Sequence, residues 1–488
     1  MQQTKPLEGK NFRPMPILIA LLLSGFIGMF SETALNVALS DLINLLHITP
    51  ATAQWLTTAY LLTLGILVPV SGMLLQCFTT RQLFIAAVSF SIVGTFIAAI
   101  APNFELLLIA RVVQAIGTGL LLPLMFNTIL VIFPPEKRGA AMGVIGLVIM
   151  VAPAVGPTIA GLLIQNLSWH WIFWLSLPFL LISLIFGIVS MQNIGEPTRP
   201  RFDLLSILLS TLGFGGIVFG FSSAGEGEGG WTSERVIISL IVGVVALIAF
   251  AIRQLTMKQP MMNLRAFRYP MFTVGTMLVL VCMMVILSSM LILPLYLQQG
   301  MGKTAFQAGL LLLPGGIING IMSPIMGRLF DKFGPKWLVI PGLIIIGVIL
   351  WFFSSISLTT TVAVIIVLHT CLMIGVSMVF MPGQTNGLNQ LPPEYYPHGT
   401  AIMNTLQQVA GAIGTAVAVS ILSSGTKQYY IDNQINPADL TKAPLAMTQG
   451  VQHAFIFGVI IAVVGLVLAL FIKRVRTSGA EAGQRAPH

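Results

Sequence analysis

The chain of 488 residues is 56% hydrophobic and only 8% charged, and its mean hydropathy is +0.93. A soluble globular protein cannot present so much apolar surface to water, so the composition excludes that class and indicates a protein that spans a membrane. The formal net charge of +9 suits attraction to anionic lipid headgroups, and we do not expect nucleic acid as a partner.

Apolar runs of about 20 residues recur along the whole chain, each long enough to cross the hydrocarbon core as an α-helix. The run that begins at residue 16 is too long for a cleaved signal peptide, so we interpret it as a retained first span. The runs predict an all-α integral membrane protein with fourteen transmembrane helices, near residues 16–39, 51–75, 82–101, 104–133, 139–164, 170–190, 204–224, 234–254, 271–297, 305–330, 336–355, 359–386, 399–424 and 453–472.

Lysine and arginine in the connections predict the orientation of these spans. Of the 24 basic residues, 19 fall on the side that carries both termini, four fall on the opposite side, and Arg111 lies inside a span. Because positive loops stay in the cytoplasm, we expect a multi-pass protein of a bacterial cell membrane with both termini cytoplasmic. The polar connection 425–452 contains two prolines and predicts a weakly ordered external loop.

Two short sequence matches indicate an internal repeat. "GMLLQCFTTRQ" from Gly72 matches "GRLFDKFGPKW" from Gly327 at an offset of 255 residues, and "FPPEKRG" from Phe133 matches "LPPEYYPHG" from Leu391 at an offset of 258. The offsets predict two related six-helix halves, and parallel halves of this kind place a substrate path between them, with alternating access by rocking. The predicted units are an N-terminal half over 1–190, a linker with two inserted helices over 191–269, and a C-terminal half over 270–488.

Glu32 and Arg111 are the acid and the base that lie deep inside predicted spans. Counting about 1.5 Å per residue puts Glu32 roughly 24 Å and Arg111 roughly 20 Å above the cytoplasmic edge. The similar depths predict that the two are partners or near neighbours, and a static structural ion pair is one interpretation. The other is proton coupling, because desolvation favours a protonated carboxyl and a movable arginine favours a charged one.

Four motifs in order resemble the signatures of the fourteen-span drug:proton antiporters of the major facilitator superfamily. They are "ETALNVALS" with Glu32 where Asp is commoner, "RVVQAIG" with Ala115 in place of Gly, "APAVGPTIAG" in the fifth span, and "WHWIFWLSLP" before the sixth. The resemblance implies the major facilitator fold and export coupled to the proton gradient, with Glu32 and Arg111 as the proton-coupling residues. One departure is that Gln76 stands where the family has Asp, whereas the second-half copy keeps Asp331.

The repeated loops and the fifth span carry the residues that we predict to control gating. In "GRLFDKFGPK" the glycines permit a tight reversal, and Asp331 can accept hydrogen bonds from amides at a nearby helix N-terminus. In the fifth span, glycines let a neighbouring helix approach and prolines permit a bend. A solvated turn and close packing alone are the alternatives. The gating residues are Gly72, Arg81, Pro153, Gly156, Pro157, Gly161, Gly327, Arg328, Asp331, Gly334 and Lys336.

Polar and aromatic side chains inside the spans are candidates for substrate contacts, because amides can bind polar groups and rings can bind cations. Helix-to-helix hydrogen bonding and ordinary core packing explain each of them equally well. The predicted substrate-binding residues are Glu32, Asn36, Trp55, Tyr60, Gln114, Phe126, Tyr296, Asn319 and Phe380.

No enzyme signature is visible, since the sequence has no GxxxxGK[ST] phosphate loop and no histidine spacing typical of a metal site. We therefore expect a secondary active transporter without metal or cofactor, driven by the proton gradient and acting as a monomer. Its expected partners are amphipathic small molecules, protons and membrane lipids. The leading function is export of lipophilic, often cationic or zwitterionic drugs; export or flipping of an endogenous lipid is the alternative, and a receptor or assembly partner is the reading we favour least.

Overall fold

The structure is a computed structural model, and it describes residues 14–48, 50–193, 203–226, 230–436, 439 and 441–475. Within them, fourteen helices are long and apolar enough to cross a membrane, which confirms the number of spans predicted. The first eight are α1 (Pro14–Leu45), α2 (Pro50–Cys77), α3 (Thr80–Ala99), α4 (Phe104–Ile132), α5 (Arg138–Asn166), α6 (His170–Ser190), α7 (Leu204–Glu226) and α8 (Glu234–Thr256). The other six are α9 (Pro270–Leu295), α10 (Ala305–Phe333), α11 (Lys336–Phe353), α12 (Val362–Asn389), α13 (Tyr396–Asp432) and α14 (Ala443–Ala469).

Short helical turns precede several of these helices: η1 (Pro135–Lys137), η2 (Gly230–Thr232), η3 (Leu264–Arg268), η4 (Tyr296–Gly300) and η5 (Pro393–Tyr395). Local sequence explains where some of the long helices begin. Thr79 and Thr304 each form a capping box with a glutamine three residues later, which satisfies the first free amides of α3 and α10. Gly334 ends α10 with φ of +83°, a backbone conformation that glycine adopts without strain.

The connection between α13 and α14 differs from the prediction. The expected loop over 425–452 is wrong, because α13 continues to Asp432 and α14 begins at Ala443. Two glycines let these helices touch: a Cβ on Gly450 would lie 2.3 Å from the carbonyl oxygen of Leu422, and one on Gly425 would lie 2.8 Å from His453 Nδ1. The polar composition of residues 425–452 predicted a loop, whereas close packing between α13 and α14 extends both helices into this segment.

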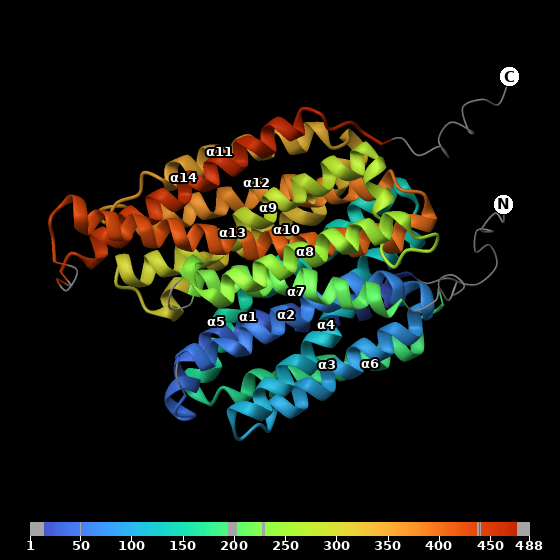
Figure 1. Ribbon diagram of the computed structural model, residues 1–488, viewed down its shortest axis with the longest axis horizontal. Helices are drawn as coiled ribbons and strands as arrows, with labels where there is room; N and C mark the ends of the chain where they lie inside the picture. Colours follow the sequence, from blue (N-terminus) through green and yellow to red (C-terminus); the bar gives the residue numbers. More distant parts are fainter. Residues whose placement is uncertain are drawn as a thin grey trace.

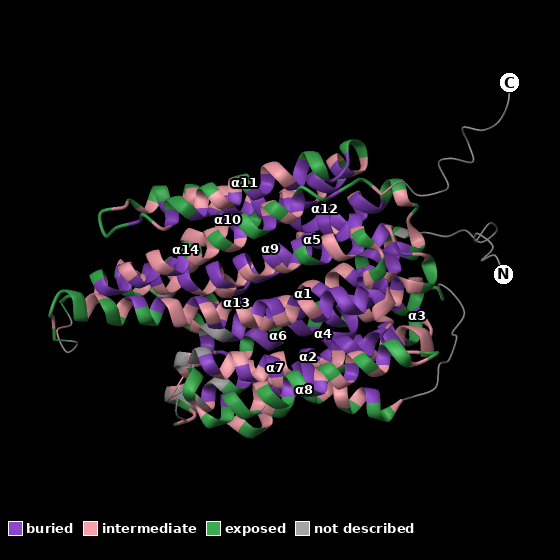
Figure 2. Cartoon of the chain, turned by 45° about the horizontal axis from the view of Figure 1, so that its top comes forward, coloured by how far each residue is buried: buried purple, intermediate pink, exposed green. Residues whose placement is uncertain are grey.

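The helices lie side by side along one direction, and the described chain begins and ends at the same end of the bundle (Figure 1). Helices α1–α6 gather in the lower part of that view and α9–α14 in the upper part, while α7 and α8 form a hairpin across the middle. Helix α7 packs against both α2 and α13. Buried residues concentrate where helices face one another, and exposed residues lie along the outer surfaces (Figure 2).

Helices α5 and α10 pack antiparallel over their whole length, and we call this contact the α5–α10 seam. A Cβ on Gly143 would lie 2.5 Å from the carbonyl oxygen of Ser323, and one on Gly316 would lie 2.0 Å from Ala154 Cβ. A second contact, the α2–α13 seam, brings Gly72 against Ala401. Small residues at both seams allow the backbones to approach closely.

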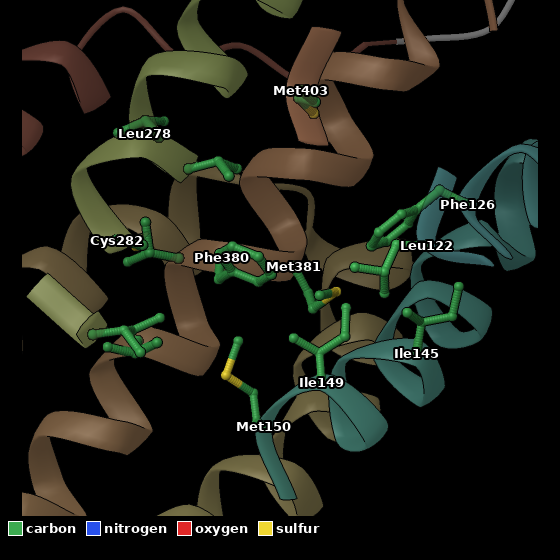
Figure 3. Packing of buried hydrophobic residues seen from close by; sticks show 14 of the residues in the cluster. Leu122, Phe126, Ile145, Ile149, Met150, Leu278, Cys282, Phe380, Met381 and Met403 are labelled. Carbon is green, nitrogen blue, oxygen red and sulfur yellow. The ribbon is translucent and has the colours of Figure 1, made fainter. Parts of the chain in front are cut away.

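Apolar side chains of α4, α5, α9, α12 and α13 form one buried cluster (Figure 3). Phe126 of α4 and Ile149 of α5 face Met381 of α12 there, and all three are less than 10% exposed. Phe126 comes fifteen residues after Arg111 on α4, about 22 Å closer to the end that carries the termini. The interior is therefore closed by packed side chains on that side of Arg111.

Candidate functional site

Arg111 is completely buried in α4. Its Nη1 donates to the carbonyl oxygen of Ser31 and to Gln114 Oε1, both at 3.1 Å, and its guanidinium carbon lies 4.1 Å from the centre of the Tyr60 ring. Its Nε and Nη2 have no hydrogen-bond partner in the described part of the chain. A buried cation with two free donors can still take up a carboxylate or another acceptor.

Two neighbours of Arg111 are themselves held in place. The Tyr60 hydroxyl donates to Thr118 Oγ1 at 2.9 Å, and Gln114 Nε2 donates to Thr95 Oγ1 at 2.8 Å. These bonds fix the ring below the guanidinium and the amide beside it. The arginine therefore occupies a preformed polar site within α1–α4.

Glu32 follows Ser31 on α1 and is half-buried. Across the residues that the structure describes, its carboxyl forms no hydrogen bond and no ion pair, although its charge and that of Arg111 act on each other. The two residues are thus near neighbours and not a closed pair. A carboxyl without a partner beside a guanidinium with open donors can alternate between a free, protonated state and a paired, charged one.

The structure brings Tyr60 and Gln114 to Arg111, and it places Phe126 and Phe380 in the apolar packing of Figure 3. Asn319 is buried in α10, where its Nδ2 lies 3.4 Å from Met373 Sδ and its Oδ1 has no described partner. The predicted substrate residues therefore fall into a polar group and an apolar group.

Two other predicted substrate residues have their contacts elsewhere. Trp55 is 44% exposed and its ring packs 5.9 Å from that of Phe219 on α7. The Tyr296 hydroxyl donates to the carbonyl oxygen of Ser357 at 2.9 Å, which ties the end of α9 to a loop. The side chain of Asn36 lies outside the described residues.

Asp331 joins α10 to the first turn of α5. Its Oδ1 accepts from the Gly139 amide at 3.0 Å and its Oδ2 from the Ala140 amide at 2.9 Å, which is the contact that the sequence predicts for this carboxylate. Arg474 donates to the carbonyl oxygen of Asp331 at 2.7 Å. We call the two hydrogen bonds that Asp331 accepts from the Gly139 and Ala140 amides the Asp331 clamp.

The remaining predicted gating residues take several positions. Arg81 donates to the carbonyl oxygen of Ile188 at 2.9 Å, so it links α3 to α6 and not to the opposite group of helices. A Cβ on Gly156 would lie 2.4 Å from Thr33 Oγ1 of α1. At the seams lie Gly72, Gly327 and Pro157, whereas Pro153, Gly161 and Gly334 are buried and Arg328 and Lys336 are exposed.

Arg138 was predicted only as a basic residue of a cytoplasmic connection, and the structure gives it a larger role. It is 6% exposed, and its Nη1 donates to the Tyr396 hydroxyl at 2.9 Å and to Asn389 Oδ1 at 3.2 Å. A signal was present, because Arg138 and Tyr396 hold the same position in the two copies of the repeated loop. Residues that a pseudo-twofold axis relates can meet on that axis.

Buried amides without described partners form a further set that the sequence analysis did not single out. Both side-chain polar atoms of Gln384, Nε2 of Gln407 and Oδ1 of Asn127 are buried and unpaired within the described residues. They come from α12, α13 and α4. Unpaired buried amides are costly unless a ligand or another conformation satisfies them.

Comparison with known proteins gives consistent matches. The profile of the Major Facilitator Superfamily matches residues 21–415. Lincomycin resistance protein LmrB of Bacillus subtilis (strain 168) is 69% identical over 474 residues, which cover 97% of this chain and 99% of that protein. Its namesake in Listeria monocytogenes serovar 1/2a is 61% identical over 97% of this chain and 100% of that protein. The crystal structure of the human organic anion transporter MFSD10 shares the fold alone, with a TM-score of 0.63 at 12% identity, over 93% of this chain and 99% of that one.

Proposed function

The chain belongs to the Major Facilitator Superfamily, and from that membership we propose that it exports lincomycin or a chemically related antimicrobial in exchange for protons. The observation that supports lincomycin as the substrate is the 69% identity, over nearly the full length of both chains, to a protein named for lincomycin resistance. Lincomycin carries a basic amine, which suits a site with an acidic side chain.

We propose Glu32 as the proton-binding group. Its carboxyl has no described partner, and neither do Nε and Nη2 of Arg111 beside it. Movement of α1 relative to α4 would bring the carboxylate onto these donors and release its proton. A cationic substrate at Glu32 would have the same effect, so substrate and proton would compete for one carboxyl.

The proposed transport cycle uses the halves 1–190 and 270–488, with the helices of 191–269 at their side. The Asp331 clamp and the Arg138 bonds hold the two groups of helices together at the end that carries the termini. If that end is cytoplasmic, as the basic loops predict, this state is closed toward the cytoplasm. Opening it requires these bonds to break.

We propose that substrate contacts come from the two groups described above. Tyr60 and Gln114 would surround the amine near Glu32, while Phe126 and Phe380 would bind apolar parts once the packed interior opens. Asn319 offers a free acceptor. The Trp55 and Tyr296 contacts make these two the weakest members of the proposed set.

Inside-out vesicles with an imposed proton gradient test the proposal. We expect gradient-driven uptake of radiolabelled lincomycin, which Glu32→Gln abolishes and Glu32→Asp retains in part. Glu105→Gln is the matched control, because Glu105 is an exposed acid in the first turn of α4. Uptake by Glu32→Gln at the parent level, with loss in Asp41→Asn, would assign the proton to Asp41.

A further inference from the structure

A hollow of about 1260 Å³ opens at the end of the bundle that carries the termini. Its walls come from η1 and the start of α5, the start of α9, the segment between α12 and α13, and the chain after α14. It therefore lies between parts of the proposed N-terminal half and parts of the C-terminal half. The volume exceeds that of most small-molecule sites.

The charges along this hollow all have one sign. Arg138, Lys473 and Arg474 line it, and no acidic side chain belongs to its described lining. Arg138 and Arg474 are held by hydrogen bonds, to Tyr396 and to the carbonyl oxygen of Asp331 respectively, so they are fixed in place. The Lys473 ammonium is exposed and has no described partner.

The neighbouring part of the wall is apolar. Met271 and Val274 of α9 and, after α14, Leu470 and Phe471 also line the hollow. Leu470 is 63% exposed and Phe471 is 62% exposed, although both follow a membrane span. A basic rim beside exposed apolar side chains, at the level where a span ends, matches an anionic headgroup with an acyl chain attached.

The C-terminal segment is pinned along this wall by its backbone. Asn386 donates to the carbonyl oxygen of Lys473 at 3.0 Å and accepts from the amide of Val475 at 3.2 Å. These bonds leave the Lys473 side chain free to bind a ligand. The residues that follow, 476–488, carry two arginines and one glutamate, so they are themselves basic and do not complement the charge of the hollow.

We propose that this hollow binds an anionic phospholipid, with its phosphate between Arg138, Lys473 and Arg474 and an acyl chain along Leu470 and Phe471. A lipid there would touch Arg138 on one side and the C-terminal segment on the other. It would therefore stabilise the state in which this end is closed. The binding site itself does not depend on the exported substrate, and only its effect on transport rests on the proposed function.

Native mass spectrometry of the full-length protein in detergent tests the site. We expect phosphatidylglycerol to bind at least ten-fold more tightly than phosphatidylcholine. Each basic residue near a headgroup contributes about five-fold in affinity, so Lys473→Gln should weaken binding about five-fold and the double variant with Arg474→Gln roughly 30-fold. If loss of Arg474 disturbs folding, the single variant Lys473→Gln still tests the site, because the Lys473 side chain makes no described contact that folding would need.

A double variant of Lys258→Gln and Arg268→Gln is the control, since both are exposed, lie in the same connection and do not line the hollow. It should bind phosphatidylglycerol as the parent does. Equal binding of the two lipids, or an equal loss in the control, overturns the proposal. Displacement of the lipid by millimolar inorganic phosphate would show that a free anion is the ligand and would overturn the lipid assignment.

Discussion

Arg138 donates a hydrogen bond of 2.9 Å to the hydroxyl of Tyr396, which lies 258 residues further along the chain, and its guanidinium carbon lies 5.0 Å from the centre of the same ring. The separation equals the offset between the two copies of the repeated loop. Equivalent positions of the two copies therefore meet directly, and the contact joins the proposed halves at their closed end.

Tyr396→Phe should loosen that end, because it removes the acceptor of a charge-assisted hydrogen bond worth about 1.5–3 kcal/mol. The measurement is maleimide labelling of Ala401→Cys in a chain without its three native cysteines; Ala401 is completely buried at the α2–α13 seam. We expect labelling at least about ten-fold faster. Tyr395→Phe is the control, since no hydrogen bond from the Tyr395 hydroxyl is described, and equal acceleration by both variants would contradict the prediction.

The two seams are equivalent by the repeat but are closed by different groups. Position 331 of the α5–α10 seam corresponds to 76 of the α2–α13 seam, where Gln76 Nε2 lies 3.4 Å from His398 Nε2. The Asp331 clamp needs two free amides, at Gly139 and Ala140. Pro397 is the repeat equivalent of Gly139 and has no amide hydrogen, so an aspartate at position 76 would find only one of the two donors.

Asp331→Asn should therefore slow transport several-fold, because it removes one acceptor and the negative charge at the positive end of α5, together about 1–2 kcal/mol. Adding Gln76→Asp should not restore the rate. Export of lincomycin, the proposed substrate, from loaded cells provides the measurement, with Glu394→Gln, an exposed acid on η5, as the control. Recovery in the double variant would show that the two seams are interchangeable.

Gly143→Ala should destabilise the folded protein by about 1–3 kcal/mol, the usual cost of overpacking. The added Cβ would lie 2.5 Å from the carbonyl oxygen of Ser323 and 2.6 Å from Cα of Pro324, and backbone atoms cannot move aside cheaply. Gly347→Ala is the matched control, because its Cβ would meet only Ala462 Cβ at 3.8 Å. Thermal unfolding in detergent should show a lower Tm for the first variant alone.

The sequence predicts the positions of some site residues and not of others. Depth could be predicted, because each residue of a helix advances by a fixed rise; hence Glu32 and Arg111 were expected to be near one another. The direction in which a side chain points around its helix could not be predicted, because it depends on which neighbouring helix packs against that face. The packing of the Trp55 ring on Phe219 of α7 could not be predicted, because the position of that inserted hairpin leaves no periodic signal in the sequence.

The pair of Asp203 and Arg253 joins the start of α7 to the end of α8, with Nε and Oδ2 2.9 Å apart. Hydrogen bonds from Arg253 lower the pKa of Asp203 from its ordinary 3.8 to about 2. The stability that the pair adds is therefore fully present above about pH 4 and is lost as the pH falls toward 2. Because the pair is partly exposed to solvent, which screens its charges, its contribution to stability is small.

The Tm difference between the parent and Asp203→Asn should accordingly be small and constant between pH 8 and pH 5. Melting both proteins in detergent at several pH values across this window measures the difference. If it closed within that window, Asp203 would titrate far higher than its contact with Arg253 allows. Any pH dependence of transport between pH 5 and pH 8 must then come from other groups.

The ring of Tyr60 should matter more than its hydroxyl. The guanidinium of Arg111 lies over this ring, and such a contact is worth about 2 kcal/mol when desolvated. The hydroxyl donates to Thr118 Oγ1 at 2.9 Å and more weakly to the carbonyl oxygen of Gly28 at 3.4 Å, and Thr118 itself donates to the carbonyl oxygen of Gln114. Tyr60→Phe keeps the ring and should retain most of the gradient-driven uptake.

Tyr60→Leu removes the aromatic face, so the buried Arg111 loses its contact with the ring. Its Nε and Nη2 remain without described hydrogen-bond partners. The cation should then pair more tightly with Glu32, so the carboxyl should give up its proton more readily and bind it more weakly. We expect proton release per lincomycin to fall while lincomycin still binds, as measured by a pH-sensitive dye beside equilibrium binding in proteoliposomes. Equal coupling in the Phe and Leu variants would mean that the ring does not tune the pair.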